Sequence, residues 1–290
     1  MERFSDRAII LKTYPYQERD RIAVCLTEHK GRITGVAKGA IHSRRYGGSL
    51  DLLTCSNLDF VQKPNAEMAR IDAAVTQHEF QNLHKDFDRL TAASFAAEFC
   101  LRLIEPHEPA REMFIILSNT LFQIDAGMPL QLAVNAFLCK AFKSMGYPPS
   151  LLRCVQCARG AHEVIEAYAG QHEGHSGLFF WYSEAGGMVC WQCGNARLKV
   201  GLEAETLLHF QRLTSTPFKE LSYESDGAGA ATQNAQLYRM LSDFLFHHIP
   251  GLPAGGLKTW KLLNDSLVLP ELLASGELVA QPDGEFDRLS

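Results

Sequence analysis

The sequence predicts an α+β multidomain protein with an N-terminal β-barrel, an α-helical body and a zinc-ribbon-like subdomain inserted into that body. Three observations predict this fold class. Residues 1–80 alternate between apolar and polar side chains, as half-buried strands do, whereas the period becomes helical from residue 81. Two Cys-x-x-Cys pairs then interrupt the helical pattern. A chain of 290 residues is long enough for several compact units.

The first domain, residues 1–80, contains about five strand segments, a number suited to a small closed barrel. A turn at residues 28–31 separates the second strand from the third and predicts a hairpin. A basic, glycine-rich loop at residues 38–48 follows the third strand. The predicted strands include residues 8–11, 22–27, 32–37, 58–62 and 69–76.

Residues 81–150 and 197–270 are predicted to form one helical body. Apolar stripes at 3–4 spacing indicate helices that end near residues 105–109, 127–129 and 146–149, where Gly and Pro occur. The helical pattern resumes around residues 207–213 and 237–245, and the Gly- and Ala-rich residues 226–233 predict a loop. Residues 271–290 are polar and acidic, which predicts a flexible tail.

The insert, residues 151–196, is predicted from two cysteine pairs that can close a tetrahedral site around one Zn²⁺. Four thiolates leave no coordination position for water or substrate, so the predicted site is structural. Gly186 and Gly187 before the second pair and Gly194 after it are expected to supply unusual backbone angles. The predicted ligands are Cys154, Cys157, Cys190 and Cys193.

Three other interpretations of these cysteines stay open at the sequence level. A disulfide pair requires an oxidising compartment, yet the N-terminus has no apolar segment after a basic start, so no signal peptide is expected. A redox Cys-x-x-Cys motif requires a βαβ context that neither pair has. A site that has lost its metal is the third alternative. The remaining cysteines, predicted to be small core residues, are Cys25, Cys55, Cys100 and Cys139.

The composition excludes several classes of protein. A hydrophobic share of 46% and a charged share of 21% are ordinary for a soluble protein, and no apolar run is long enough to span a bilayer. The pattern of a phosphate-binding loop is absent, as are those of a zinc protease and a zinc deaminase. We therefore expect no catalytic residues and no enzymatic activity.

Charge is unevenly distributed along the chain. Residues 1–50 hold ten Lys and Arg against five Asp and Glu, whereas residues 200–290 hold six against twelve. Cations interleaved with tyrosines, including Tyr14 and Tyr16, are typical of barrels that hold nucleic acid by charge and stacking. A basic but merely solvated face is the alternative. The candidate nucleic-acid contacts are Lys12, Arg19, Arg21, Lys38, Arg44, Arg45 and, for stacking, Tyr46.

Residues 10–22, 26–31 and 36–40, together with 146–154 and 186–193, resemble the bacterial RecO family of recombination mediators. The resemblance covers residues 1–215. It implies an N-terminal OB-fold barrel, a helical body and a zinc insert. It also implies binding of single- and double-stranded DNA, annealing of complementary strands, and action with RecR to load RecA onto strands covered by single-strand-binding protein. A cytoplasmic, nucleoid-associated location follows from the same resemblance.

The resemblance places the dock for the tail of single-strand-binding protein on the helical body. That tail is acidic and ends in an apolar residue, so an apolar cleft beside a cation is expected. Ordinary solvated side chains are the alternative interpretation. A zinc-ribbon adaptor in transcription or ribosome assembly is the competing function, and a zinc hydrolase is disfavoured because four thiolates close the metal site. The candidate dock residues are Arg102, Lys140 and Lys143.

Overall fold

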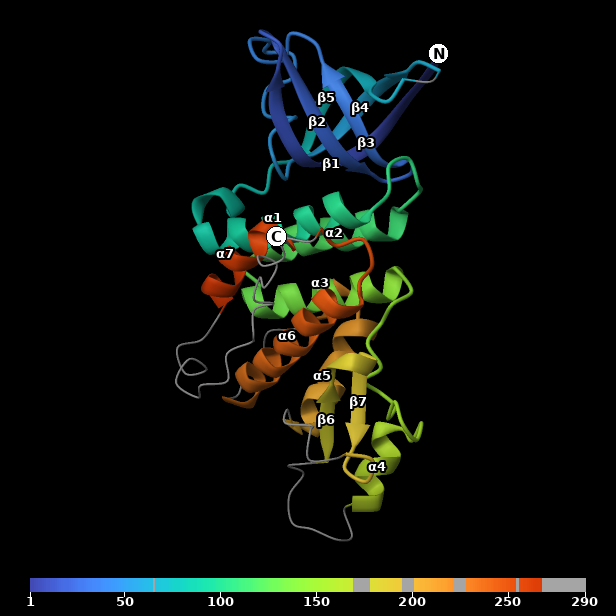
Figure 1. Cartoon of the computed structure of the whole chain (residues 1–290). Coiled ribbons are helices and arrows are strands. Elements are labelled where there is room, and N and C mark those ends of the chain that lie inside the picture. Colours follow the sequence, from blue (N-terminus) through green and yellow to red (C-terminus); the bar gives the residue numbers. More distant parts are fainter. Residues whose placement is uncertain (65, 169–177, 195–200, 222–227, 254–255, 268–290) are drawn as a thin grey trace, which may run out of the picture.

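The computed structural model describes residues 1–64, 66–168, 178–194, 201–221, 228–253 and 256–267. The barrel lies at one end of the molecule, layers of helices lie in the middle, and a small sheet with a short helix lies at the far end (Figure 1). The predicted acidic tail at residues 271–290 falls outside the described residues, so that prediction stays untested.

The N-terminal strands close into a barrel in the order β1-β2-β3-β5-β4. The pairing of β3 with β5 is parallel and the other pairings are antiparallel. A closed five-stranded barrel with this order is the OB fold, as expected. The strands are β1 (Glu2–Tyr16), β2 (Asp20–Thr27), β3 (Gly31–Ala37), β4 (Cys55–Gln62) and β5 (Ala69–His78).

The helical body confirms the predicted periodicity. Each of its long helices buries the apolar stripe that the sequence indicates, for example Phe95 and Phe99 on α1 and Phe137 on α3. Loops at the predicted Gly and Pro positions separate the first three helices. The helices are α1 (Phe87–Leu103), α2 (Arg111–Asp125), α3 (Leu130–Ser144), α5 (Ala204–Ser215) and α6 (Ala228–His248).

Two helices and one helix start differ from the sequence analysis. The short helix α4 (Ala161–Tyr168) lies inside the predicted insert, and the last described helix, α7 (Lys258–Leu267), lies inside the predicted helical body, but neither helix is predicted individually. The prediction of a loop over residues 226–233 is wrong from residue 228 onward, where α6 begins. Alanine at positions 228, 230 and 231 favours a helix, and packing of α6 on α3 and α5 outweighs the cost of its single glycine.

The barrel packs on the body through alternate residues of β1. Ala8 and Ile10 belong to the apolar interior of the barrel, whereas Ile9 and Leu11 join the core that α1 and α2 share. Successive side chains of a strand point to opposite faces, so an unbroken apolar run here serves two cores. Arg32 adds a hydrogen bond from its Nε to the carbonyl oxygen of Ile104, at 2.7 Å.

The insert forms a three-stranded sheet in the order β7-β6-β8. Its apolar residues, among them Phe179 and Val189, belong to the same buried cluster as the helical body. Three short 3-10 turns complete the described fold, at Leu83–Lys85, Ser183–Ala185 and Phe218–Glu220. The strands of the insert are β6 (Phe179–Tyr182), β7 (Gly187–Cys190) and β8 (Gly201–Leu202).

None of the described helices combines the length and the apolar character that crossing a membrane requires.

Candidate metal centre and nucleic-acid interface

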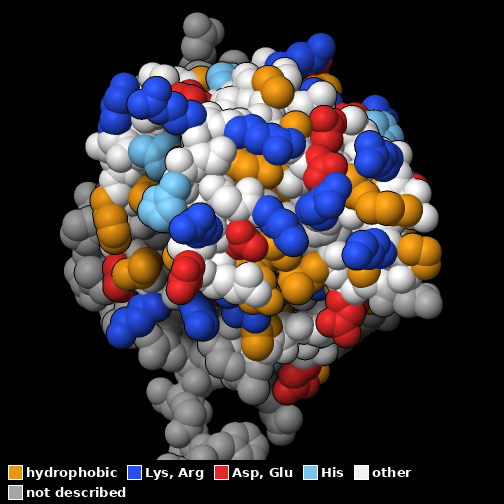
Figure 2. Space-filling view, turned by 90° about the horizontal axis from the view of Figure 1, so that it is seen from above, with side chains coloured by type: hydrophobic (Ala, Val, Ile, Leu, Met, Phe, Trp, Pro, Cys, Tyr) orange, Lys and Arg blue, Asp and Glu red, His pale blue; other side chains and the backbone are white. Residues whose placement is uncertain are grey.

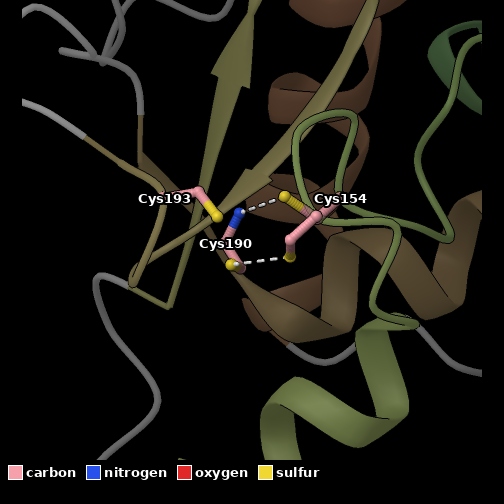
Figure 3. Close-up of side chains that lie close together, drawn as sticks. Cys154, Cys190 and Cys193 are labelled. Carbon is pink, nitrogen blue, oxygen red and sulfur yellow. Dashed lines mark hydrogen bonds between the residues drawn. The ribbon is translucent and has the colours of Figure 1, made fainter.

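Four cysteine sulfurs converge at the base of the insert. The Sγ atoms of Cys154, Cys157, Cys190 and Cys193 all lie within 4.8 Å of one another. Figure 3 shows the labelled side chains of Cys154, Cys190 and Cys193 pointing toward one another. The sulfurs of Cys157 and Cys190 are 3.8 Å apart, far beyond the roughly 2.05 Å of a disulfide bond. One convergent cluster, rather than two linked pairs, is the arrangement that a metal ion needs.

Short backbone hydrogen bonds shape both cysteine turns. In the first turn, the N–H of Ala158 donates to the carbonyl oxygen of Cys154 at 2.8 Å, and Ala158 has a positive φ of 61°. In the second turn, which begins where β7 ends, the N–H of Gly194 donates to the carbonyl oxygen of Cys190 at 2.8 Å. Each turn therefore brings its two sulfurs to the same side.

The glycines near the second pair serve two different purposes. Gly186 has a left-handed φ of 59°, as the sequence analysis expects. Gly187 and Gly194 do not have a positive φ, so the expectation of unusual angles there is wrong. A Cβ on Gly187 would lie 2.4 Å from Cγ1 of Val155, and one on Gly194 would lie 3.1 Å from the ring of Phe180. Close packing therefore requires glycine at position 187, whereas at position 194 a side chain would require the Phe180 ring to shift slightly.

The sulfurs titrate differently in the absence of a cation. Burial disfavours the Cys154 thiolate, but hydrogen bonds from the backbone N–H groups of Cys190, Cys157 and Gln156 lower its pKa to about 6. Burial and the neighbouring thiols raise the pKa of Cys190, and they raise the pKa of Cys193 to about 12. A bound cation would stabilise all four thiolates together, so the donor set fits a tetrahedral thiolate-binding metal.

The insert that carries the cysteine cluster is tied to the body through α6. Trp181 on β6 donates its Nε1–H to Oδ2 of Asp243 at 2.6 Å, and the imidazole of His248 lies 2.5 Å from the carbonyl oxygen of Ser183. A Cβ on Gly186 would lie 2.8 Å from the ring of Phe244. Loosening the insert would therefore disturb the C-terminal half of α6.

Exposed cations collect at the end of the barrel that faces away from the body. Figure 2 shows Lys and Arg side chains spread over this end, with Asp and Glu between them. Lys12, Arg19, Lys38 and Arg44 are exposed, and the described part of the chain gives none of the four an ion-pair partner. This surface can approach a polyanion without first breaking a salt bridge at these positions.

The β1–β2 hairpin and the loop after β3 carry these cations side by side. The N–H of Ile41 donates to the carbonyl oxygen of Arg19 at 3.0 Å, and the N–H of Gly39 donates to Oδ1 of Asp20 at 2.8 Å. These two bonds hold the start of the loop against the hairpin tip. The structure thereby brings Arg19 and Lys38 together, although they are far apart in the sequence.

Three other predicted contacts are already engaged within the barrel. Tyr46 is 3% exposed and donates its hydroxyl to the carbonyl oxygen of Ile71 at 3.0 Å, so the prediction that it stacks on a base is wrong. The guanidinium of Arg45 lies over the Tyr46 ring, 5.5 Å from its centroid. Arg21 pairs with Asp51 at 2.8 Å.

Two other tyrosines are available for stacking. Tyr14 and Tyr16 on β1 are 38% and 37% exposed, and Nζ of Lys12 lies 5.2 Å from the Tyr14 ring centroid. The sequence analysis notes both tyrosines but selects Tyr46. The signal that separates them is the strand pattern, because Tyr14 and Tyr16 share the exposed face of β1 with Lys12.

The candidate dock residues do not share one environment. Lys140 donates from Nζ to the carbonyl oxygen of Thr216 at 2.5 Å and lies 5.2 Å from the ring centroid of Phe218. Burial lowers the pKa of Lys140. Arg102 lies 3.8 Å from the Glu98 carboxylate on the same helix. Lys143 is exposed and has no ion-pair partner among the described residues, so it is the most accessible of the three.

Comparison with known proteins supports the sequence resemblance. The family model described as Recombination protein O N terminal matches residues 1–80, and the model described as Recombination protein O C terminal matches residues 84–255. The chain belongs to the RecO family. One RecO relative, the DNA repair protein RecO of Anaeromyxobacter sp. (strain K), is 28% identical over 254 residues, which cover 86% of this chain and 92% of the relative.

A second RecO relative comes from a different genus. The DNA repair protein RecO of Geobacter metallireducens is 30% identical over 209 residues, or 72% of this chain and 80% of its own. The RecO matches include both the barrel and the cysteine cluster, whereas α7 begins after the end of the C-terminal family match at residue 255.

Proposed function

We propose that this chain is a non-enzymatic, DNA-binding recombination mediator. In this proposal it binds single- and double-stranded DNA, anneals complementary strands and, with RecR, helps to load RecA onto single strands covered by single-strand-binding protein. Membership of the RecO family supports a role in recombination repair. The proposed location is the cytoplasm, where these partners and the nucleoid are found.

The observation that carries the proposal is a group of exposed cations, without ion-pair partners among the described residues, beside exposed tyrosines on one end of an OB barrel. Arg19, Lys38 and Arg44 would contact phosphates, and Tyr14 and Tyr16 would stack on bases in the place first assigned to Tyr46. Phosphate contacts supply affinity without sequence preference, and a tyrosine ring stacks on any base. A mediator of recombination must bind DNA without sequence specificity.

The annealing mechanism requires no bond to be made or broken. Two strands repel each other through their phosphates, and a cationic surface that neutralises both lowers that repulsion. Stacking on Tyr14 or Tyr16 would hold bases unpaired until a complementary strand arrives. The helical body would meanwhile hold the acidic tail of single-strand-binding protein, with Lys143 as the accessible cation.

The metal proposed for the four-cysteine cluster is one Zn²⁺ with a structural role. The donor set is four sulfurs and the cluster lies against the buried core, which fits a closed tetrahedral site. The ion would hold the two cysteine turns together, and thereby β7 and the start of α4. Because all four positions are filled by protein, the site would bind no substrate.

A strand-annealing assay tests the proposed function. Complementary oligonucleotides coated with single-strand-binding protein are mixed with wild-type protein or with an Arg19→Ala/Arg44→Ala variant. Wild type should accelerate annealing and the variant should not. In direct titrations of a single strand, the slope of log K against log salt should shrink by about 1.4 in the variant, about 0.7 for each lost phosphate contact.

Three results would contradict the proposal or part of it. No annealing above the spontaneous rate by wild-type protein would remove the mediator function. Stable co-purification with RNA polymerase or ribosomal subunits, without binding to DNA, would support the competing zinc-ribbon adaptor. Equal salt slopes for wild type and variant, with annealing intact, would place the DNA elsewhere on the molecule.

A further inference from the structure

One arginine pairs with a carboxylate on the outer surface of the barrel. Arg70 on β5 donates from Nε and Nη2 to the two carboxylate oxygens of Asp72, at 2.5 and 2.9 Å. The pKa of the Asp72 carboxyl is lowered by this pairing with Arg70 and, to a smaller extent, by the charges of Arg3 on β1 and Arg45 in the loop after β3. None of Arg3, Arg70 and Asp72 belongs to the contacts predicted from the sequence.

Strand register places Arg3 and Arg70 at the same level of the sheet, with one strand, β4, between them. Both are cross-strand partners of Val61 on β4, one from each side. The adjacent residues Phe4, Phe60 and Ile71 belong to the barrel interior, as their inclusion in its apolar cluster shows. Because neighbouring residues of a strand alternate between faces, the two arginines project outward, and each flanks Val61.

A bulge and a buried tyrosine position the other two groups. The pairing of β4 with β5 shifts between Phe60 and Asp59, and Asp72 is the extra residue of β5 at this irregularity. The Tyr46 hydroxyl donates to the carbonyl oxygen of Ile71, the residue before Asp72, and the Arg45 guanidinium lies over the Tyr46 ring. Tyr46 therefore fixes Arg45 beside Asp72.

We propose that Arg3, Arg45 and Arg70 form a phosphate-binding site for the nucleic-acid backbone and that Asp72 occupies it in the unbound protein. A guanidinium presents the same fork to a carboxylate and to a phosphate. Three cations against one anion leave a net charge of +2. The Arg70 and Asp72 side chains are 43% and 32% exposed, so a phosphate can reach them from solvent.

This inference rests on the proposed function and extends it to a second surface. Arg45 belongs to the loop that carries Arg44 and Lys38, so the arginine cluster continues the cationic surface from the hairpin toward β4 and β5. A single strand that crosses the loop would exchange the Arg70–Asp72 pair for an Arg70–phosphate pair. Asp72 would thereby lower affinity by competing with each incoming phosphate.

The Asp72→Asn variant tests the site because it removes the competitor and keeps the side-chain shape. Its affinity for a single-stranded oligonucleotide at low salt should rise at least about threefold, and its salt slope should steepen by about 0.7. Arg3→Ala should lower the affinity and make the salt slope shallower. In an Arg70→Ala background, Asp72→Asn should raise the affinity less, since the arginine that Asp72 pairs with is gone. Asp265→Asn, the same charge change on exposed Asp265 of α7, is the matched control.

Several outcomes would overturn the site. The first is that Asp72→Asn binds the oligonucleotide no more tightly than wild type while its melting temperature is unchanged. The second is that Asp265→Asn raises the affinity for the oligonucleotide as much as Asp72→Asn does, which would attribute the increase to net charge. If Asp72→Asn binds inorganic phosphate more tightly than wild type but does not bind the oligonucleotide more tightly, the arginines form a small-anion site instead. If wild-type protein shows no salt-dependent DNA binding, the proposed function fails as a whole. If wild-type protein binds DNA and these variants bind it with the same affinity and salt slope, only the proposed arginine site is contradicted.

Discussion

Gly31 joins the barrel to the helical body at a point where no side chain fits. Its φ is 70°, and a Cβ there would lie 1.8 Å from the carbonyl oxygen of Glu108. Nearby, the N–H of His107 donates to the carbonyl oxygen of Arg32 at 3.1 Å. The loop between α1 and α2 therefore lies directly against the turn between β2 and β3, and the absence of a side chain permits that contact.

Gly31→Ala should destabilise the protein far more than the matched change at Gly39. Gly39 has nearly the same φ, 68°, but open space around the position of a Cβ. Gly39→Ala should therefore cost only the backbone strain, about 1–2 kcal/mol, whereas Gly31→Ala adds a steric clash with backbone. Denaturant unfolding of both variants measures the difference. Equal free energies of unfolding would show that the barrel–body contact does not depend on Gly31.

Each cysteine of the four-cysteine cluster should be required for metal binding and for stability. Cys157→Ser should lose the metal and lower the melting temperature, because binding energy at a structural site is folding energy. Cys100→Ala is the control, since Cys100 is buried in the body away from the cluster and its loss should leave one metal per chain. Metal analysis and thermal unfolding give the readout. Protein purified without chelators that contains no zinc, or an unchanged melting temperature for Cys157→Ser, would contradict the prediction.

Among the secondary-structure elements, α7 depends most on a distant residue. Glu98 on α1 accepts hydrogen bonds from the backbone N–H groups of Lys258 and Thr259, at 3.0 and 2.8 Å. A helix begins with unpaired N–H groups, and here the capping carboxylate comes from another helix. Trp260 then packs between Phe95 and Tyr238. The element that lies beyond the family match is thus held by the body.

Glu98→Ala should loosen α7 while leaving the barrel intact. Removing the carboxylate leaves two N–H groups without their acceptor, which should cost about 2 kcal/mol or more. Hydrogen exchange of the α7 amides and the emission of Trp260 report the change. Arg102→Ala is the control, because its 40% exposed guanidinium lies 3.8 Å from Glu98 and such a pair contributes little. Unchanged exchange in α7 would show that apolar packing alone holds the helix.

Over the whole molecule, the proposed DNA surface and the candidate dock for a partner are separate. The cations of the barrel lie at its free end, whereas Lys143 lies on α3 in the helical body, on the other side of α1 and α2 (Figure 1). One continuous apolar core runs from the underside of the barrel through the body to the insert. A change at one surface should therefore leave the other surface intact while the core stays folded.

Lys143→Glu should separate the two binding activities. An acidic peptide with the tail sequence of single-strand-binding protein should bind the variant at least about fivefold more weakly, a loss of roughly 1 kcal/mol. Binding of a single-stranded oligonucleotide should stay unchanged. Lys261→Glu, at an exposed lysine of α7, is the control. Lys140 is a poorer test because its ammonium group already binds the carbonyl oxygen of Thr216. Equal peptide affinities for wild type and Lys143→Glu would place the dock elsewhere.

The sequence by itself determined the features that are encoded within a few neighbouring residues. Strand alternation and helical stripes predict the barrel and most helices, because each pattern repeats within one element. The spacing within each Cys-x-x-Cys pair predicts the cysteine cluster for the same reason. The exposure of Lys38 and Arg44 follows from a basic loop rich in glycine. These conclusions needed no knowledge of which elements meet.

Only the tertiary structure decided which of these side chains are available. Tyr46 and Lys140 look solvent-facing in the sequence, but one is buried against Ile71 and the other binds the backbone at Thr216. Arg3 and Arg70 flank the same residue, Val61, because both of their strands pair with β4, and Glu98 caps a helix that begins 160 residues later. Such contacts join distant segments, and a local pattern carries no information about them because burial and hydrogen bonding depend on the packing of the whole chain.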